Sequence, residues 1–184
     1  MSPGPNGGGR RTSRPDPLTS EQRRLNMSRI RGKDTKPELV VRKGLHARGL
    51  RYRLHDRKLP GTPDLVFPSR RAVLFIHGCF WHGHDCPLYK APSTNADFWE
   101  KKVSANRQRD ALHNAELGRR GWRVLSIWEC AVRGRGRRPF PELMDDIQGW
   151  FAADATEGEI GGCWTNDTAA NADSRAAGAN QGDA

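Results

Sequence analysis

Residues 61–86 read GTPDLVFPSRRAVLFIHGCFWHGHDC, and this stretch decides the fold. A Gly-Thr-Pro sequence breaks the chain before a short apolar run at 64–67, and turn residues at 68–71 lead into a second run at 72–76. Two such runs on either side of a turn are typical of a β-hairpin. The second run is apolar throughout, so it predicts a central strand that is covered on both faces.

Helical and strand patterns precede this hairpin. Thr35 and Glu38 form a T-x-x-E capping box for a helix that Gly49 ends. A shorter basic helix is predicted over 19–30, and alternation of apolar residues with arginines predicts a half-buried strand over 50–54. The hairpin therefore follows two helices and one strand.

Three further elements follow the hairpin: a long helix over 96–117, a core strand over 122–128 and an amphipathic helix over 141–151. The resulting order predicts an α/β sandwich with a mixed sheet. Both ends are rich in Gly, Pro, Ala, Asn and Asp and have few apolar anchors. We expect a disordered basic tail over 1–18, one folded domain over 19–153 and a disordered acidic tail over 154–184.

The charge of the chain indicates a polyanionic partner. The 184 residues carry a net charge of +10, and residues 154–184 hold six acidic residues against one arginine, so the rest carries +15. A basic surface also aids solubility, but nucleic acid is the leading partner. The sequence has neither a secretory signal nor the run of about 20 apolar residues that a membrane span needs. We therefore expect a cytoplasmic protein with no membrane partner.

One short segment, together with a later cysteine, supplies five side chains that could bind zinc: Cys79, His82, His84, Cys86 and Cys130. In a reducing cytoplasm, closely spaced cysteines and histidines indicate a metal more often than a disulfide. A structural zinc site needs four ligands. We prefer Cys79, His84, Cys86 and Cys130, which leaves His82 free for chemistry. The alternative is reduced core cysteines beside surface histidines.

Asp64 is predicted to lie near Ile76 and His77, because it begins one strand of the hairpin and they end the other. Hydrolysis of a phosphodiester needs a carboxylate that holds Mg²⁺ and a group that activates water. Histidine titrates near neutral pH, so His77 and His82 could act as base or acid. An isolated Pro-Asp pair is more often only a turn. The whole constellation predicts a nuclease.

The chain resembles the very short patch repair endonucleases from about residue 25 to residue 133. The resemblance is carried by GTPD at 61–64, FIHGCFWHGHDC at 75–86, DFW at 97–99 and WRVLSIWEC at 122–130. It implies a restriction-endonuclease-like three-layer fold. It also implies an enzyme that nicks double-stranded DNA 5′ to the thymine of a T:G mismatch left by deamination of 5-methylcytosine.

The resemblance further implies roles for individual residues: Asp64 and the Ile76 backbone carbonyl bind catalytic Mg²⁺, His77 and His82 take part in catalysis, and Cys79, His84, Cys86 and Cys130 hold structural Zn²⁺. Ile76 stands where threonine is familiar in the family, and Gly83 and Asp85 stand where histidines are familiar. No side chain at these three positions is a ligand in this assignment. We therefore expect both metal sites to be intact.

Glu38 has two interpretations of equal weight. Locally it completes the capping box, a contribution of about 1 kcal/mol. It also matches a family carboxylate that supports the active site, which we expect to act by orienting His82. The two roles do not exclude each other.

Three large aromatic residues, Phe80, Trp81 and Trp99, lie beside the proposed site. Core packing is the usual fate of tryptophan, but these rings belong to a polar region that is hard to bury. The resemblance implies that they wedge into the base stack at the mismatch. Candidates for contacts to phosphates or bases are Asn106, Arg107, Arg109, Arg29, Arg31 and the run at 133–138.

Two alternatives remain open at this stage. One is a restriction-like endonuclease of the same fold with another target, because specificity depends on a few contacts that the sequence does not place. The other is a zinc-containing DNA-binding module without catalysis, which would have no use for Asp64, His77 and His82 together. We expect a monomer that acts on T:G-mismatched double-stranded DNA in the nucleoid, with mismatch-repair proteins as further candidate partners.

Overall fold

The computed structural model describes residues 19, 21–22, 24–25, 32–92 and 94–164. Of the basic helix predicted over 19–30, residues 21, 22, 24 and 25 are helical, while residues 20, 23 and 26–31 lie outside the described part. The predicted N-terminal tail and residues 165–184 of the predicted C-terminal tail lie outside it as well. None of the described helices is long and apolar enough to cross a membrane.

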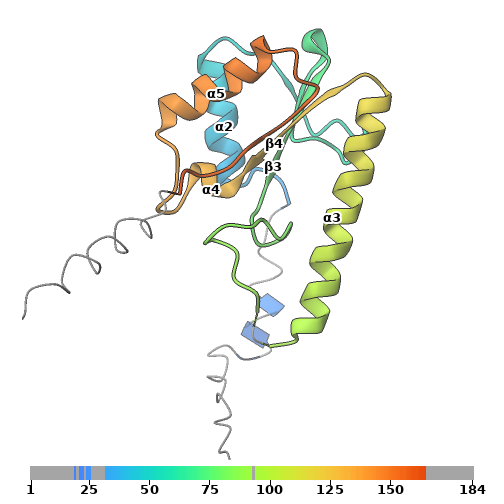
Figure 1. Ribbon diagram of the computed structural model, residues 1–184, viewed down its shortest axis with the longest axis vertical. Helices are drawn as coiled ribbons and strands as arrows, with labels where there is room; N and C mark the ends of the chain where they lie inside the picture. The colour runs from blue at the N-terminus through green and yellow to red at the C-terminus, as the bar shows by residue number, and fades with distance from the viewer. Residues whose placement is uncertain (1–18, 20, 23, 26–31, 93, 165–184) are drawn as a thin grey trace, which may run out of the picture.

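A mixed five-stranded sheet forms the centre of the fold (Figure 1). In sheet order the strands are β1 (Arg53–Leu54), β2 (Leu65–Phe67), β3 (Ala72–His77), β4 (Arg123–Trp128) and β5 (Glu157–Ile160). The first three strands are antiparallel, whereas β3, β4 and β5 run parallel. The hairpin is confirmed by the pairing of β2 with β3, which places Leu65 opposite Leu74.

Helices cover both faces of the sheet, as Figure 1 shows. On one face, α2 (Lys36–Ala47) and α5 (Phe140–Ala152) pack against Leu74 and its neighbours; on the other, α3 (Ala96–Arg119) packs against Val73 and Phe75 through Leu117. Successive residues of β3 thus enter opposite cores, as the apolar run predicted. The α/β sandwich is confirmed.

The boundaries of two helices follow from local chemistry. Thr35 Oγ1 accepts a hydrogen bond from the Glu38 backbone N–H at 3.3 Å and so caps α2, and Gly49 follows the helix in the left-handed conformation with φ +82°. The long helix α3 continues through Gly118 to Arg119 before the chain turns at Gly121, where φ is +74°. The predicted strand over 50–54 is shorter, since only its last two residues pair with β2.

The folded domain extends beyond residue 153, where the sequence analysis ended it. Strand β5 pairs with β4, with Ile127 opposite Ile160. Its acidic, glycine-containing sequence is typical of a disordered tail. An edge strand, however, is held by backbone hydrogen bonds to the neighbouring strand and does not depend on apolar side chains. A Cβ at Gly158 would lie 2.5 Å from the indole nitrogen of Trp150, so glycine allows α5 to pack closely over this strand. Residues 154–164 therefore belong to the domain.

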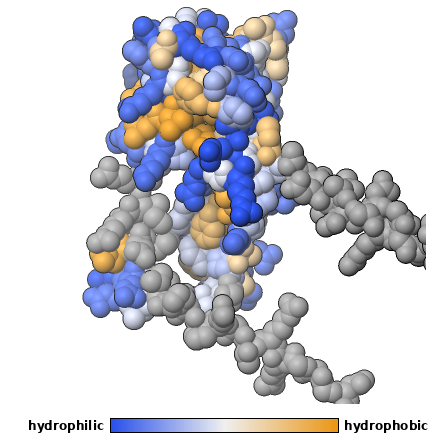
Figure 2. Space-filling view, turned by 90° about the vertical axis from the view of Figure 1, so that its left-hand side faces the viewer, coloured by the Kyte–Doolittle hydropathy of each residue, from blue (hydrophilic) through white to orange (hydrophobic). Residues whose placement is uncertain are grey.

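Apolar side chains gather on one part of the surface. Figure 2 shows an apolar patch on the upper half of that face with hydrophilic side chains around it. Between α2, α5 and the short helix α4 (Glu129–Val132), a groove is lined by Val40, Val132, Phe140 and Leu143, with Arg135 and Arg137 beside them. This groove shares no lining residue with the clefts at the histidines described next.

Candidate active site and metal cluster

Asp64 immediately precedes β2 and lies beside the end of β3. Its Oδ2 accepts a hydrogen bond from the Ile76 backbone N–H at 2.7 Å, so the hairpin brings these residues together as predicted. Burial raises the pKa of Asp64 to about 7; Glu38 adds to this effect, while the Ile76 N–H and His82 oppose it. A bound cation would stabilise this desolvated carboxylate in its charged form.

His77 and His82 lie side by side. Their ring centroids are 4.2 Å apart; His77 ends β3 and is buried, whereas His82 lies in the loop that follows. Burial, together with the nearby charge of His82, lowers the pKa of His77 to about 4. His77 is therefore neutral at pH 7, with one ring nitrogen that donates and one that accepts.

Asp110 on α3 completes this group, and the sequence analysis missed it. Its Oδ2 lies 2.5 Å from His82 Nδ1. Burial works to raise the pKa of Asp110, but the hydrogen bond with His82 and the charges of His82 and His77 hold it below its usual range. The ionised carboxylate only accepts hydrogen bonds, so it fixes the proton of His82 on Nδ1. Asp110 lies one helical turn after Asn106, and this spacing could have identified it.

Glu38 does not orient His82, contrary to the expectation. Its side chain is almost fully buried, and Oε1 lies 3.0 Å from Arg42 and 3.2 Å from His55 Nε2. Its backbone N–H donates to Thr35 Oγ1, so the cap at Thr35 is confirmed, but among the described contacts the Glu38 carboxylate meets Arg42 and His55 and does not complete the capping box. The histidine beside the Glu38 carboxylate is His55, which directly follows β1, and not His82. The spacing of residues near Glu38 in the sequence does not reveal this contact.

Two clefts open on either side of the histidine pair. One, of about 360 Å³, extends from His77 and His82 to Arg107 and Asp110. The other, of about 520 Å³, extends from the same pair to Trp81, Lys102 and Glu129. Among the described residues, Asp64 lines neither cleft; its side chain is 19% exposed. A substrate in either cleft would therefore meet the histidines first.

The three aromatic candidates form one cluster. Phe80 lies 5.1 Å from Trp81 and 5.2 Å from Trp99 between ring centroids, and the two indoles are 5.9 Å apart. All three are half-buried, and neither hydrophobic core of the described residues includes them. Core packing is therefore not their role, and Trp81 also lines the larger cleft.

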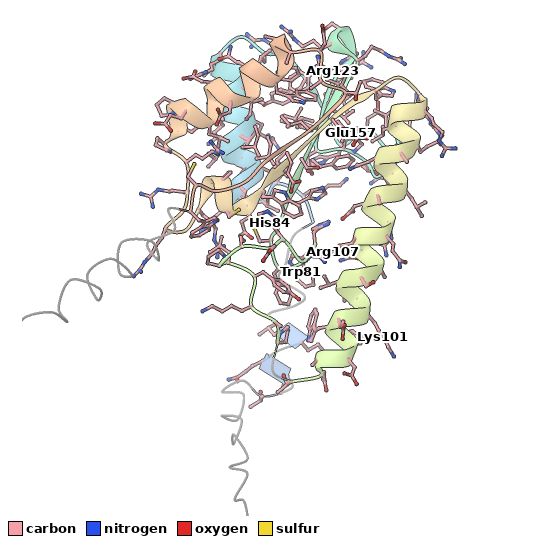
Figure 3. All side chains as sticks on the ribbon, viewed as in Figure 1. Trp81, His84, Lys101, Arg107, Arg123 and Glu157 are labelled. Atoms are coloured by element: carbon pink, nitrogen blue, oxygen red, sulfur yellow. The ribbon has the colours of Figure 1, made fainter. Side chains whose placement is uncertain are left out.

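Two residues predicted to contact DNA, Asn106 and Arg107, hold the loop after β3 onto α3. Asn106 Nδ2 donates to the Trp81 carbonyl at 2.8 Å, and Arg107 Nε donates to the His82 carbonyl at 3.0 Å. Figure 3 shows Arg107 on α3 beside the loop that carries Trp81. The close approach explains Gly83, because a Cβ there would lie 2.4 Å from Val103. Arg109 bonds Asn106 Oδ1 at 3.3 Å, and Arg29 and Arg31 lie outside the described residues.

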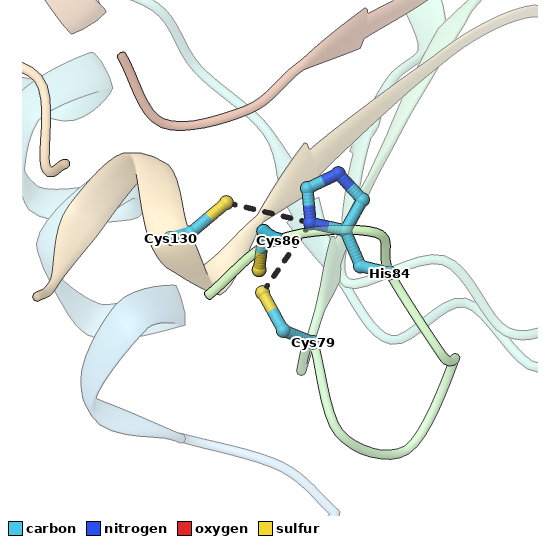
Figure 4. A group of neighbouring side chains, drawn as sticks. All are labelled: Cys79, His84, Cys86 and Cys130. Carbon is cyan, nitrogen blue, oxygen red and sulfur yellow. Dashed lines mark hydrogen bonds between the residues drawn. The ribbon is translucent and has the colours of Figure 1, made fainter. Parts of the chain in front are cut away.

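Cys79, His84, Cys86 and Cys130 meet beside β4 (Figure 4). One ligand atom from each lies within 4.8 Å of the others, and His84 Nδ1 is 3.6 Å from Cys79 Sγ and 3.5 Å from Cys130 Sγ. The cysteines are free thiols. Burial raises the pKa of Cys79 and of Cys130, and neighbouring sulfurs contribute, so a cation is needed to hold them as thiolates. Three sulfurs and one nitrogen fit the donor set of a structural zinc site.

The chain around β5 closes this cluster. The Gly162 backbone N–H donates to Cys130 Sγ at 3.2 Å. The His84 ring stacks on Trp128 at 4.1 Å between centroids, and its Nε2 lies 3.9 Å from Glu159 on β5. The segment that the sequence analysis assigned to a tail therefore supports the predicted metal ligands.

The chain is similar in sequence to DNA mismatch endonucleases and type II nicking enzymes. The family model described as DNA mismatch endonuclease Vsr matches residues 15–88. The type II nicking enzyme V.XorIIP of Xanthomonas oryzae pv. oryzae is 51% identical over 121 residues, or 66% of this chain and 89% of that protein. DNA mismatch endonuclease Vsr of Escherichia coli is 40% identical over 138 residues, or 75% and 88%. The type II nicking enzyme V.NmeAIP of Neisseria meningitidis is 42% identical over 135 residues, or 72% and 96%. The chain belongs to the Vsr family of DNA mismatch endonucleases.

Proposed function

We propose that the protein is a Mg²⁺-dependent DNA endonuclease that nicks double-stranded DNA 5′ to the thymine of T:G mismatches and so starts very short patch repair. The observation that carries the proposal is the His82–Asp110 pair, which lies against the neutral His77; the charge of His82 also acts on the half-buried Asp64. Family membership and the net charge of +10 support DNA as the substrate.

The two histidines have separate roles, one as proton acceptor and one as hydrogen-bond donor. Asp110 keeps the His82 proton on Nδ1, which leaves Nε2 free to accept a proton from the attacking water. His77, neutral at pH 7, can donate its N–H to an oxygen of the scissile phosphate.

Asp64 and the Ile76 backbone carbonyl would hold the catalytic Mg²⁺. When bound, this ion supplies a positive charge that polarises the phosphate and stabilises the leaving oxygen. Support comes from the Ile76 backbone N–H, which bonds Asp64 Oδ2 and so keeps this residue beside the carboxylate. The isoleucine side chain takes no part in this arrangement, so the departure from threonine is tolerated.

The aromatic cluster supports recognition of a mismatch. Phe80, Trp81 and Trp99 stay partly exposed, and Trp81 lines the larger cleft together with Lys102. Insertion of rings between base pairs costs less at a weakly paired T:G step than at a Watson–Crick step. The loop that presents two of these rings is held by Asn106 and by the cysteine cluster, so we assign that cluster a structural Zn²⁺.

The test is incubation of the purified protein with duplexes that carry T:G, C:G or T:A at one position, with and without Mg²⁺. A Mg²⁺-dependent nick confined to the T:G duplex is the expected result. Equal cutting of all three would favour a restriction-like endonuclease with another target. Binding without cutting would favour a zinc-containing DNA-binding module, and the Asp64→Asn variant provides the inactive control.

We further propose that the protein works as a monomer and that mismatch-repair proteins are its partners in the cell. Both histidines, Asp110 and Asp64 come from one chain, so the proposed chemistry needs no second copy. Sedimentation of the protein alone and with a T:G duplex measures whether it is a monomer. A dimer that forms only on DNA would contradict it.

A further inference from the structure

His55 lies between Glu38 and Asp64, yet the chemistry proposed above does not use it. The antiparallel pairing of β1 with β2 places Leu54 opposite Leu65. One step further along, the His55 backbone N–H donates to the Asp64 carbonyl at 3.2 Å. His55 is therefore the cross-strand neighbour of Asp64 by the register of the sheet.

The imidazole of His55 faces one carboxylate with each nitrogen. Its Nε2 lies 3.2 Å from Glu38 Oε1, and its Nδ1 lies 3.8 Å from Asp64 Oδ1. The side chain is 12% exposed, and both ring nitrogens are closed off from solvent without a well-formed hydrogen bond. Water cannot satisfy these nitrogens, so the two carboxylates are the groups available to them.

The backbone at His55 is also unusual. Its φ is +48°, in the left-handed region, which costs a residue other than glycine on the order of 1 kcal/mol. Such conformations persist where the surrounding structure holds them, and they concentrate at functional sites. Here the backbone bond to Asp64 and the ring contact with Glu38 hold the residue from two sides.

A cation bound at Glu38 is the competing explanation, because Asp34, Glu38 and His55 lie close enough to share one. Arg42 already occupies that place: its guanidinium lies 2.5 Å from Asp34 and 3.0 Å from Glu38. A metal ion there would be repelled by this fixed positive charge. Glu38 is thus anchored by Arg42 and presents its carboxylate to His55.

We propose that His55 is a positioning residue that links the anchored Glu38 to Asp64. His55 restrains Asp64 Oδ1 while the Ile76 N–H holds Oδ2, so the carboxylate keeps one orientation for its metal. Each carboxylate oxygen has two lone pairs, so both remain able to bind a cation. This inference rests on the proposed role of Asp64 as a metal ligand. Residues that orient a ligand commonly contribute 10- to 100-fold in metal affinity or activity.

The test measures Mn²⁺ binding, as a spectroscopic substitute for Mg²⁺, by electron paramagnetic resonance on the full chain with a T:G duplex. We expect His55→Ala to weaken Mn²⁺ binding about tenfold and to raise the Mg²⁺ concentration for half-maximal nicking by a similar factor. Binding of the duplex without divalent metal should not change. His46→Ala, an exposed histidine on α2, is the matched control and should bind Mn²⁺ normally.

Two amide substitutions separate positioning from a general effect on folding. In His55→Asn the amide nitrogen takes the place of Nδ1 and faces Asp64, and asparagine tolerates a positive φ. In His55→Gln the amide reaches only toward Glu38. We expect His55→Asn to bind Mn²⁺ nearly as the wild type does and His55→Gln to bind about tenfold more weakly, with thermal melting followed for both.

The outcomes are distinguishable from those of the proposed function. If His55→Ala and His55→Gln both bind Mn²⁺ like the wild type while Asp64→Ala does not, the positioning role is wrong and the metal site stands. If Asp64→Ala also binds Mn²⁺ normally, the assignment of Asp64 fails and the role of His55 fails with it.

Discussion

Asp110 on α3 lies 2.5 Å from His82 in the loop after β3, and this contact ties the crossover helix to the histidine pair. The hydrogen bond from Arg107 to the His82 carbonyl lies one turn earlier on the same helix. The ring and the backbone of His82 are thus both held by α3. The position of the proposed base depends on the helix as much as on the hairpin.

Replacement of Asp110 should therefore remove activity without unfolding the protein. Asp110→Asn keeps the size of the side chain but loses its charge and no longer fixes the proton of His82 on Nδ1. We expect the single-turnover nicking rate on a T:G duplex to fall about 100-fold or more, with thermal stability little changed. Glu116→Gln is the control on the same helix, because the ion pairs of Glu116 within the described part of the chain are with the surface residues Arg119 and Arg120. An unchanged rate in Asp110→Asn would show that His82 is not the base.

Asp64→Asn should abolish nicking and yet stabilise the protein in the absence of Mg²⁺. The Asp64 pKa rises from 3.8 to about 7 on folding, so between these values the folded chain binds more protons than the unfolded chain. The free energy of unfolding of the wild type therefore falls as pH rises from about 4 to about 7. Asparagine does not titrate, so the Asp64→Asn variant lacks this pH-dependent loss of stability.

We expect the stabilisation by Asp64→Asn to be about 2 kcal/mol larger at pH 8 than at pH 5. Urea unfolding at the two pH values without added Mg²⁺ measures it, with Asp97→Asn at an exposed position as the control. A stabilisation that is the same at both pH values would mean that the ionisation of Asp64 is not the cause.

The sequence predicted the features that depend on local patterns. The cap at Thr35, the central strand β3 and three of the four clustered candidate ligands (Cys79, His84 and Cys86) follow from spacing within short segments, and the fourth, Cys130, follows from the end of a core strand. The closeness of Asp64 to Ile76 follows from the register of a hairpin, which a short turn fixes.

Contacts between segments that are far apart in the sequence could not be predicted from local patterns. The His55–Glu38 contact crosses from the end of β1 to α2, and no periodicity in either segment indicates it. Strand β5 has one buried apolar residue, Ile160, so its acidic sequence resembles a tail; its pairing depends on the edge that β4 offers. Sequence periodicity reports burial, whereas these features depend on where a neighbouring backbone or carboxylate lies.

Removal of one sulfur from the metal cluster should release zinc and destabilise the domain. Cys130 is fully buried in the short helix α4 and joins it to the loop through His84. We expect the wild type to hold one zinc per chain, and Cys130→Ser to lose it together with about 3 kcal/mol or more of stability. Elemental analysis and thermal unfolding measure the two effects.

Cys163→Ser supplies the matched control for this experiment, since Cys163 is exposed and lies outside the cluster. It should keep both the zinc and the stability of the wild type. Retention of zinc by Cys130→Ser, or its loss from Cys163→Ser, would contradict the ligand set.

Gly162→Ala should loosen the same cluster without removing a ligand. A Cβ at Gly162 would lie 2.6 Å from the Gly136 carbonyl oxygen and 2.7 Å from that of Cys130, so the backbone must move and the bond from the Gly162 N–H to Cys130 Sγ weakens. We expect a loss of about 2 kcal/mol, which lowers the melting temperature by about 4–8 °C, and faster zinc release to a chromogenic chelator. At Gly161 an added Cβ would meet its nearest neighbour, the His84 ring, at 3.5 Å, an ordinary contact, so Gly161→Ala should leave both measurements unchanged. Equal behaviour of the two variants would mean that the chain after β5 does not support the metal ligands.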